Sequence, residues 1–223
     1  MIARRFALLA TLALSLLAGC AHQRPQPYDY SAFQKARPAT LLVLPPLNES
    51  PDVKATPAVW SNATRPLSEA GYYVLPVALV DATFKQNGIT DAADAQAVAW
   101  QKLHEVFGAD AAVYIDVKRY GTSYHVLASD TRVEASARMV DLRTGGLLWQ
   151  GSAVASSAEN NGGGGGIAGL LVKAIVDQIV KSTTDAAFTY AAIADTRMLG
   201  APRYNGILPG PRSPRFGQVP TDP

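Results

Sequence analysis

The fold is indicated most clearly by residues 131–150, which read TRVEASARMVDLRTGGLLWQ. Between Val133 and Met139 every second residue is apolar, and the residues between them are polar or charged. This alternation is typical of an antiparallel strand that has one face in water. A Thr-Gly-Gly turn at residues 144–146 separates this strand from a second apolar segment at 147–155. The pattern predicts a β-hairpin in the second half of a sheet.

Shorter apolar segments predict the rest of the sheet and its helices. Three further strands are expected at residues 41–44, 72–77 and 112–117. Helices are expected at residues 58–70 and 78–86, from Asp91 or Asp94 to Phe107, and after the hairpin at 167–180. Pro66 should kink or divide the first of them. The expected fold class is therefore α/β or α+β, with a mixed β-sheet flanked by helices and an antiparallel C-terminal hairpin.

The first twenty residues have the pattern of an export signal. Two arginines precede an apolar run at residues 6–18, which has about the length of a secretory signal and is shorter than a membrane span. Residues 17–20 read LAGC and are similar to the bacterial lipobox, in which diacylglycerol alkylates the cysteine thiol. We predict a signal peptide at residues 1–19 and lipidation of Cys20, the only cysteine of the chain.

The location follows from the same segment. Several acyl chains on Cys20 would anchor the protein stably, because each buried methylene contributes about 0.8 kcal/mol. Residue 21 is alanine, whereas an aspartate there retains Gram-negative lipoproteins in the inner membrane. The expected location is therefore the outer membrane, with a lipid anchor. An ordinary signal peptide or an uncleaved anchor with an incidental cysteine is the alternative interpretation.

Composition divides the remaining chain into three parts. Residues 20–38 are mostly polar and contain three prolines, so we expect a flexible tether. Residues 39–195 are expected to form a single α/β domain. Residues 196–223, rich in proline, glycine and arginine, are expected to form a disordered tail that contacts peptidoglycan, an anionic membrane surface or a partner. Beyond residue 19 the 18 basic side chains balance 18 acidic ones, so the charge does not favour binding to nucleic acid.

Two adjacent segments after the hairpin need separate interpretations. Residues 162–166 are five glycines, and the Lys-Ser/Thr of a phosphate-binding loop does not follow them, so a surface loop or hinge is expected. In the helix at 167–180, Lys173 and Asp177 fall on one polar stripe opposite a broad apolar face. That helix would pack on the sheet, or it would present a surface to a partner protein or a bilayer.

The residues that could carry chemistry do not form a catalytic or metal-binding pattern. The three histidines lack ligand spacing, and the Ser-x-x-Lys and Gly-x-Ser-x-Gly patterns are absent from the sequence. We therefore expect no enzyme activity, no metal and no cofactor. Tyr72, Tyr73 and Tyr124 are candidates for an interaction surface, with residues 120–124 as an exposed turn; packing in the core is their alternative role.

Several short motifs together resemble a known family. They are residues 42–46 (LVLPP), 49–51 (ESP), 69–73 (EAGYY), 83–88 (TFKQNG), 107–110 (FGAD) and 141–145 (DLRTG). The set resembles a family of bacterial outer-membrane lipoproteins of unknown function that includes a meningococcal surface lipoprotein antigen, over about residues 40–195. The resemblance implies a domain similar to the N-terminal domain of TolB and to CsgG-like lipoproteins, and it supplies no catalytic residues.

Two functions are compatible with these observations. The first is a non-enzymatic outer-membrane lipoprotein that joins a cell-envelope complex for secretion or assembly, with a CsgG-like lipoprotein or further copies of itself as partners. This partner class is implied by the resemblance alone. The second is a binding module for a glycan or a lipid, with a pocket lined by Tyr72, Tyr73 or Tyr124. A hydrolase is a third class, and no motif supports it.

Overall fold

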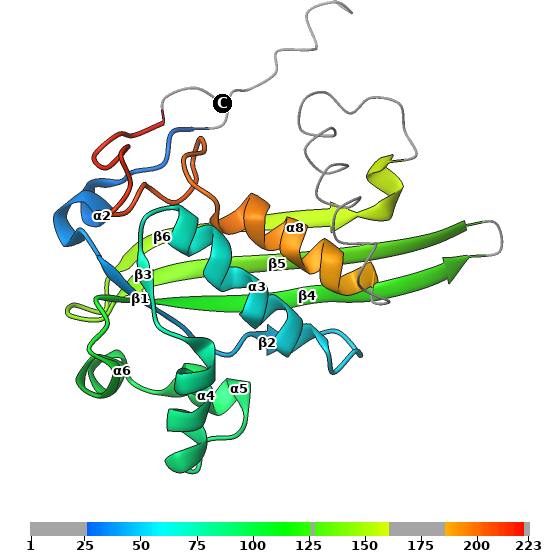
Figure 1. The fold of residues 1–223 in the computed structure, drawn as a ribbon, viewed down its shortest axis with the longest axis horizontal. Coiled ribbons are helices and arrows are strands. Elements are labelled where there is room, and N and C mark those ends of the chain that lie inside the picture. The colour runs from blue at the N-terminus through cyan, green and yellow to red at the C-terminus, as the bar shows by residue number, and fades with distance from the viewer. Residues whose placement is uncertain (1–25, 126–127, 161–185, 221–223) are drawn as a thin grey trace, which may run out of the picture.

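The structure is a computed structural model that describes residues 26–125, 128–160 and 186–220 (Figure 1). In chain order its elements are α2 (Ser31–Ala36), β1 (Thr40–Val43), β2 (Leu47–Asn48), α3 (Ala55–Glu69), β3 (Tyr73–Val74), α4 (Val77–Gln86), α5 (Ala92–Ala97), α6 (Trp100–Phe107), β4 (Ala111–His125), β5 (Ala128–Asp141), β6 (Leu147–Ser156), the 3-10 helix η1 (Ser157–Asn160) and α8 (Ala186–Leu199). Cys20, the glycine run and the expected helix at 167–180 lie outside the described residues.

The strands form one mixed sheet, as the sequence predicts. Its order is β3-β1-β4-β5-β6, and β2 pairs with β4 beyond the end of β1. β1 is parallel to β3 and β4, and β2 is parallel to β4, whereas the pairs β4–β5 and β5–β6 are antiparallel. The expected α/β class with an antiparallel C-terminal hairpin is confirmed.

Helices α3 and α8 pack against each other and lie across one face of the sheet (Figure 1). In β5 the alternate residues Val133, Ala135 and Met139 are buried, whereas Glu134 and Arg138 are half-buried or exposed. The period of two in the sequence therefore sets which face of the sheet receives the helices. α8 was not expected from the sequence, and its many buried alanines allow it to approach the sheet closely.

Two helices differ from the sequence prediction. α3 is a single helix through Pro66, which lies in its last turn with only three helical residues after it, so little of the helix remains for a kink to redirect. The helix expected to run to Phe107 is divided into α5 and α6, because the backbone at Val98 is extended. The expected start and end of this helical region are confirmed. The Asp91 carboxylate caps α5 by accepting from the Ala93 N–H at 2.7 Å, and Gly108 ends α6 in the left-handed conformation.

The N-terminal segment is more ordered than a flexible tether. Tyr30 and Phe33 are buried, and α2 follows directly. The Tyr30 hydroxyl donates to the Gly206 carbonyl at 2.5 Å, and the Tyr28 N–H donates to the Asn205 side chain at 2.8 Å. The tether prediction is therefore wrong for residues 28–38, because two aromatic side chains provide the apolar area that the polar composition obscured.

The C-terminal residues also pack on the domain, contrary to the expected disordered tail. Residues 201–220, here called the C-terminal strap, contribute the buried side chains Ile207 and Leu208 to the core. The Leu208 carbonyl accepts from the Tyr72 hydroxyl at 2.6 Å. Two apolar side chains and a buried hydrogen bond therefore fix a segment whose proline and glycine content predicted disorder.

The close approach of two backbone segments explains why residues 71 and 210 are glycines. The Gly210 N–H donates to the Ala70 carbonyl at 2.8 Å, and the Arg212 N–H donates to the Gly71 carbonyl at 3.0 Å. Gly71 has a φ of +98°, and a Cβ atom there would lie 2.4 Å from the Ser213 nitrogen. Only glycine satisfies both the positive φ and the close approach, so residues 69–73 form the surface on which the strap packs.

Asp195 in α8 is a buried carboxyl group without a hydrogen-bond partner within the described part of the chain. Its side chain is fully buried, and this burial raises its pKa well above the ordinary value of 3.8. The folded state therefore holds this proton more tightly than the unfolded state. The group's contribution to stability is complete below pH 3.8 and is lost as the pH rises through the raised pKa.

We expect Asp195→Asn to stabilise the protein more at pH 7 than at pH 4, relative to the wild type, because the amide does not ionise. Urea unfolding at both pH values measures the difference, and comparing the two pH values removes the constant cost of burying the amide. Asp81→Asn, at an exposed position of α4, is the control. An equal response of the two variants would contradict the assignment.

Candidate functional site

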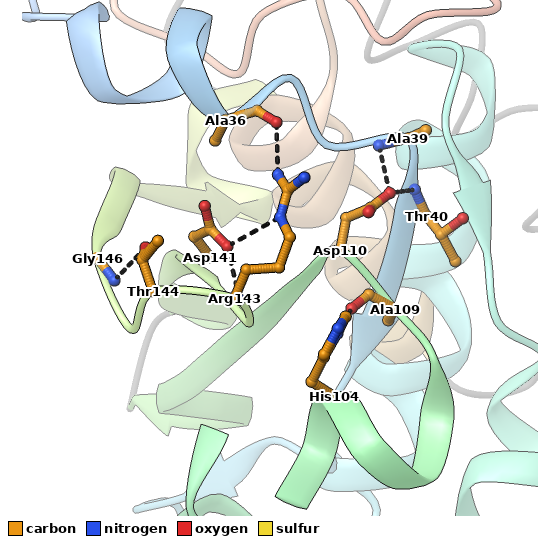
Figure 2. A network of polar contacts seen from close by, with 10 residues as sticks. All are labelled: Ala36, Ala39, Thr40, His104, Ala109, Asp110, Asp141, Arg143, Thr144 and Gly146. Carbon is orange, nitrogen blue, oxygen red and sulfur yellow. Dashed lines mark hydrogen bonds and ion pairs between the residues drawn. The ribbon is translucent and has the colours of Figure 1, made fainter. Parts of the chain in front are cut away.

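The motif at residues 107–110 places a carboxylate at the start of the first strand. Asp110 follows α6, and its Oδ2 accepts from the backbone N–H groups of Ala39 and Thr40, both at 2.9 Å (Figure 2). These hydrogen bonds to an ionised acceptor fix the chain where it enters the sheet. Asp110 is thus engaged by the backbone and is not directed at a substrate cavity.

The motif at residues 141–145 fastens the end of α2 to the hairpin turn. The buried Asp141 carboxylate accepts from the Arg143 N–H at 2.7 Å, and the Arg143 Nη2 donates to the Ala36 carbonyl at 2.5 Å (Figure 2). Gly145, with a φ of +74°, lies so close to Trp100 that a Cβ atom would be 2.6 Å from the indole nitrogen. The turn therefore joins β5 to α2 through polar contacts and packs against Trp100 of α6.

His104, the one histidine whose side chain the structure describes, is also engaged. His104 Nδ1 lies 2.8 Å from the Ala109 carbonyl oxygen, which fits a histidine that supports the turn after α6 (Figure 2). Over residues 26–125, 128–160 and 186–220, no three histidine, aspartate, glutamate or cysteine side chains gather closely enough to hold a metal ion.

The structure separates the tyrosines that the sequence singled out. Tyr72 is buried, and desolvation raises the pKa of its hydroxyl. Tyr73 is 44% exposed, and the Arg212 guanidinium lies 5.2 Å from its ring centroid. Tyr124 belongs to β4, opposite Ser129, so the turn expected at residues 120–124 is wrong. Lys173 and Asp177 lie outside the described residues and remain predictions.

An open groove of about 870 Å³ lies beside the β4–β5 hairpin. We call it the hairpin groove; it is lined by residues 49–53 and 118–123, with Asp130 and Arg132. Lys118 forms an ion pair with Glu49 across the groove. Val53 is 85% exposed. Val53 is the most exposed large hydrophobic side chain of the described residues, and it lines the same groove as the Glu49–Lys118 ion pair.

Local geometry builds this groove. β2 pairs with β4 so that Asn48 lies opposite Val117, which brings residue 49 beside the hairpin. The Asn48 amide donates to the Asp52 carbonyl at 2.9 Å and its oxygen accepts from the Ser50 N–H at 2.9 Å, which shapes the loop. The ESP motif of this loop is visible in the sequence, but its proximity to β4 is not, because only the pairing of β2 with β4 brings the two segments together.

Hydrogen bonds from β6 and η1 hold β5 in place at Asp130, which lies near the end of the β4–β5 hairpin. Asp130 Oδ1 accepts from the Ser156 hydroxyl at 2.6 Å and from the Ser157 hydroxyl at 3.0 Å. The hydrogen bond from Ser156 is the main cause of the lowered pKa of Asp130. The groove therefore has a wall held by β5 and β6 together.

A second, smaller cavity of about 220 Å³ lies between α2 and the strap. Its lining includes Phe33, Arg37, Tyr72, Leu208 and Phe216. Tyr73 is not among the residues that line it. The lining is mainly apolar, which would suit a small apolar group.

The fold and the motif network define a class of small α/β lipoprotein domains. The chain belongs to the GNA1162-like family, whose model, described as "Putative lipoprotein GNA1162-like", matches residues 28–212. The resemblance seen in the sequence is confirmed, and so is the lipoprotein class. In the described residues no helix has the length and apolar character needed to cross a membrane.

Individual relatives agree with the family. The chain is 49% identical over 205 residues to "Putative lipoprotein NMB1124/NMB1162" of Neisseria meningitidis serogroup B (strain ATCC BAA-335 / MC58), covering 92% of this chain and 95% of the relative. The crystal structure of lipoprotein GNA1162 from Neisseria meningitidis is 54% identical, with a TM-score of 0.53, and covers 65% of this chain and 100% of that one. The PelC dodecamer from Paraburkholderia phytofirmans is 11% identical, with a TM-score of 0.44, over 72% of this chain and 84% of that one.

We expect Asp110→Ala to lower the free energy of unfolding by about 2 kcal/mol, because two backbone donors lose a charged acceptor. Protease cleavage within residues 26–38 should become faster in the same variant. Urea unfolding and timed proteolysis measure the two effects. Asp81→Ala, which removes an exposed ion pair with Lys85, should cost only about 0.5 kcal/mol; equal losses would show that Asp110 does not fasten the segment.

Proposed function

We propose that this protein is a non-enzymatic lipoprotein of the outer membrane that joins a cell-envelope protein assembly. A lipid on Cys20 would hold it at the membrane, and a CsgG-like lipoprotein or further copies of this chain would be its partners. The lipobox-like residues 17–20, Ala21 and the lipoprotein family support the anchor. The polar network supports a role without catalysis, because its carboxylates bind backbone groups.

The observation that carries this proposal is the position of the hairpin groove. The N-terminal segment and α2 lie at one end of the domain, while the β4–β5 hairpin extends toward the other end (Figure 1). A protein tethered through residue 20 would therefore hold its anchored end at the bilayer and present the hairpin away from it. The groove combines exposed Val53 with paired charges, which fits a protein surface of complementary charge.

In-cell cross-linking tests this contact. A photoreactive amino acid at Thr122, an exposed residue of the groove, should form an adduct with a CsgG-like lipoprotein or a second copy of the chain, identified by mass spectrometry. The same probe at Lys85, on exposed α4, is the matched control. Val53→Asp should reduce the yield at Thr122 about tenfold, because it places a charge in the contact.

The outcomes separate the anchor from the contact. Cys20→Ser should release the protein from membranes and abolish the adduct. If the wild type fractionates with membranes but Thr122 gives no more adduct than Lys85, the groove is not the contact surface. If Cys20→Ser still fractionates with membranes at an unchanged mass, the lipid anchor itself is contradicted.

The small cavity beside Tyr72 favours one second candidate, a binding module for a lipid or a glycan. A mainly apolar space of about 220 Å³ would accept part of an acyl chain rather than a whole sugar polymer. A short-chain phospholipid below its micelle concentration should then raise Tm, and Phe216→Ala should remove the shift. An unchanged Tm over the accessible lipid concentrations would exclude this candidate.

A further inference from the structure

The two terminal segments of the described domain form one continuous surface. The Asn205 amide donates to the Gln26 carbonyl at 2.9 Å, and its oxygen accepts from the Tyr28 N–H at 2.8 Å. In Figure 1 the N-terminal segment and the strap lie side by side near α2. We call the exposed side of residues 26–38 and of the strap, together with Tyr73, the terminal face.

The covalent chain limits how far this face can be from a lipid on Cys20, and this step rests on the proposed anchor. Five residues lie between position 20 and Gln26, the first described residue, so six Cα–Cα steps join the two positions. At a maximum of about 3.5 Å per residue, they span no more than about 21 Å. That distance is well below the thickness of a bilayer, which is about 40 Å with its headgroups. The terminal face is therefore the part of the described domain that an anchored chain would hold nearest to the membrane.

The charge of this face is strongly positive. Residues 26–38 and 201–220 contain five cations, Lys35, Arg37, Arg203, Arg212 and Arg215, and all five are exposed. The same segments contain one acid, Asp29, whose carboxylate accepts from the Ser31 N–H at 2.9 Å. The neighbouring Glu69 is paired with Arg65. A cluster of this sign attracts an anionic lipid surface.

Exposed apolar and aromatic side chains accompany these cations. Tyr73 is 44% exposed, Phe216 is 40% exposed and Val219 is 36% exposed. The Arg37 guanidinium lies 5.2 Å from the Phe216 ring centroid, and Arg212 lies at the same distance from Tyr73. Arginine beside an aromatic ring is an arrangement suited to the headgroup region, where the guanidinium meets phosphate and the ring meets the acyl boundary.

We propose that the terminal face docks on a bilayer surface containing anionic phospholipid. Arg37, Arg212 and Arg215 bind headgroup phosphates, and Phe216 and Val219 insert at the level of the headgroups. The docking fixes the orientation of the domain, which a lipid on a short chain alone does not. The hairpin groove then points away from the bilayer.

Fluorescence quenching on the full-length lipidated protein tests this orientation. The protein is reconstituted in vesicles of phosphatidylcholine alone or of equal parts phosphatidylcholine and phosphatidylglycerol, each with headgroup spin label. A fluorophore is attached through Gln218→Cys on the terminal face or through Thr122→Cys in the hairpin groove. Cys20 does not compete for the label, because lipidation consumes its thiol. We expect strong quenching at position 218 in the anionic vesicles, and little at position 122.

Charge variants give the chemical test. The pair Arg212→Gln and Arg215→Gln should weaken docking about fivefold per residue, since one cation near an anionic surface contributes about 1 kcal/mol. The matched control, Lys85→Gln with Lys102→Gln, removes two exposed cations from α4 and α6 and should leave quenching unchanged. High salt should weaken the contact as the arginine changes do. Far-UV circular dichroism verifies that each variant is folded.

Each outcome decides between the anchor and the docking. If the protein floats with the vesicles but position 218 is quenched no more than position 122, the docking is wrong and the anchor stands. If quenching at 218 is equal in neutral vesicles and unaffected by the arginine changes, the proposed recognition of anionic lipid is wrong. If purified peptidoglycan removes the quenching, the wall polymer is the preferred partner and the proposal is overturned. If the wild type does not float, the lipid anchor fails, and with it the basis of the docking.

Discussion

The close approach of the chain at Gly71 and Gly210 is the constraint on which both ends of the molecule depend. A Cβ atom at Gly210 would lie 2.6 Å from the Gly71 carbonyl oxygen, so the strap reaches its place only because both positions lack a side chain. Once held there, the strap supplies Asn205 and Gly206, which bind the N-terminal segment, and its Asn205 carbonyl accepts from the Trp149 indole at 3.0 Å. One backbone contact thus organises the terminal face and ties it to β6.

The polar motifs at residues 107–110 and 141–145 also attach the N-terminal segment to the domain, on the other side of α2. Asp110 binds the backbone at the entrance of β1, and Arg143 binds the carbonyl at the end of α2. Both acidic motifs therefore have a structural explanation that requires no substrate. The carboxylates of both motifs are engaged by backbone N–H groups, two at Asp110 and one at Asp141. This explains how a family can be recognised by such motifs although they form no catalytic constellation.

The sequence predicted the parts of the fold whose signal is local. The hairpin from 131 to 155 was predictable because alternation and turn chemistry act between neighbouring residues. The strap was not, because its composition indicates disorder while Ile207 and Leu208 find their partners far away in the chain. The hairpin groove was equally impossible to predict from the sequence, since residues 49 and 118 meet only through the pairing of β2 with β4. Tyr72 and Tyr73 are neighbours in the sequence, but Tyr72 is buried just before β3 while Tyr73 in β3 is 44% exposed, a difference that depends on packing with distant residues.

Charge balance over the whole chain conceals an uneven distribution. Of the 18 cations and 18 acids beyond residue 19, the two terminal segments hold five cations and one acid, which leaves 13 cations and 17 acids elsewhere. A body with this distribution is attracted to an anionic surface through one face and repelled through the others, even though its net charge is zero. Within a Debye length, about 8 Å at physiological ionic strength, that difference acts as a torque. A lipid tether of at most about 21 Å lets the terminal face come within that range of the bilayer, so anchoring and charge asymmetry together can determine which side of the domain meets its partners.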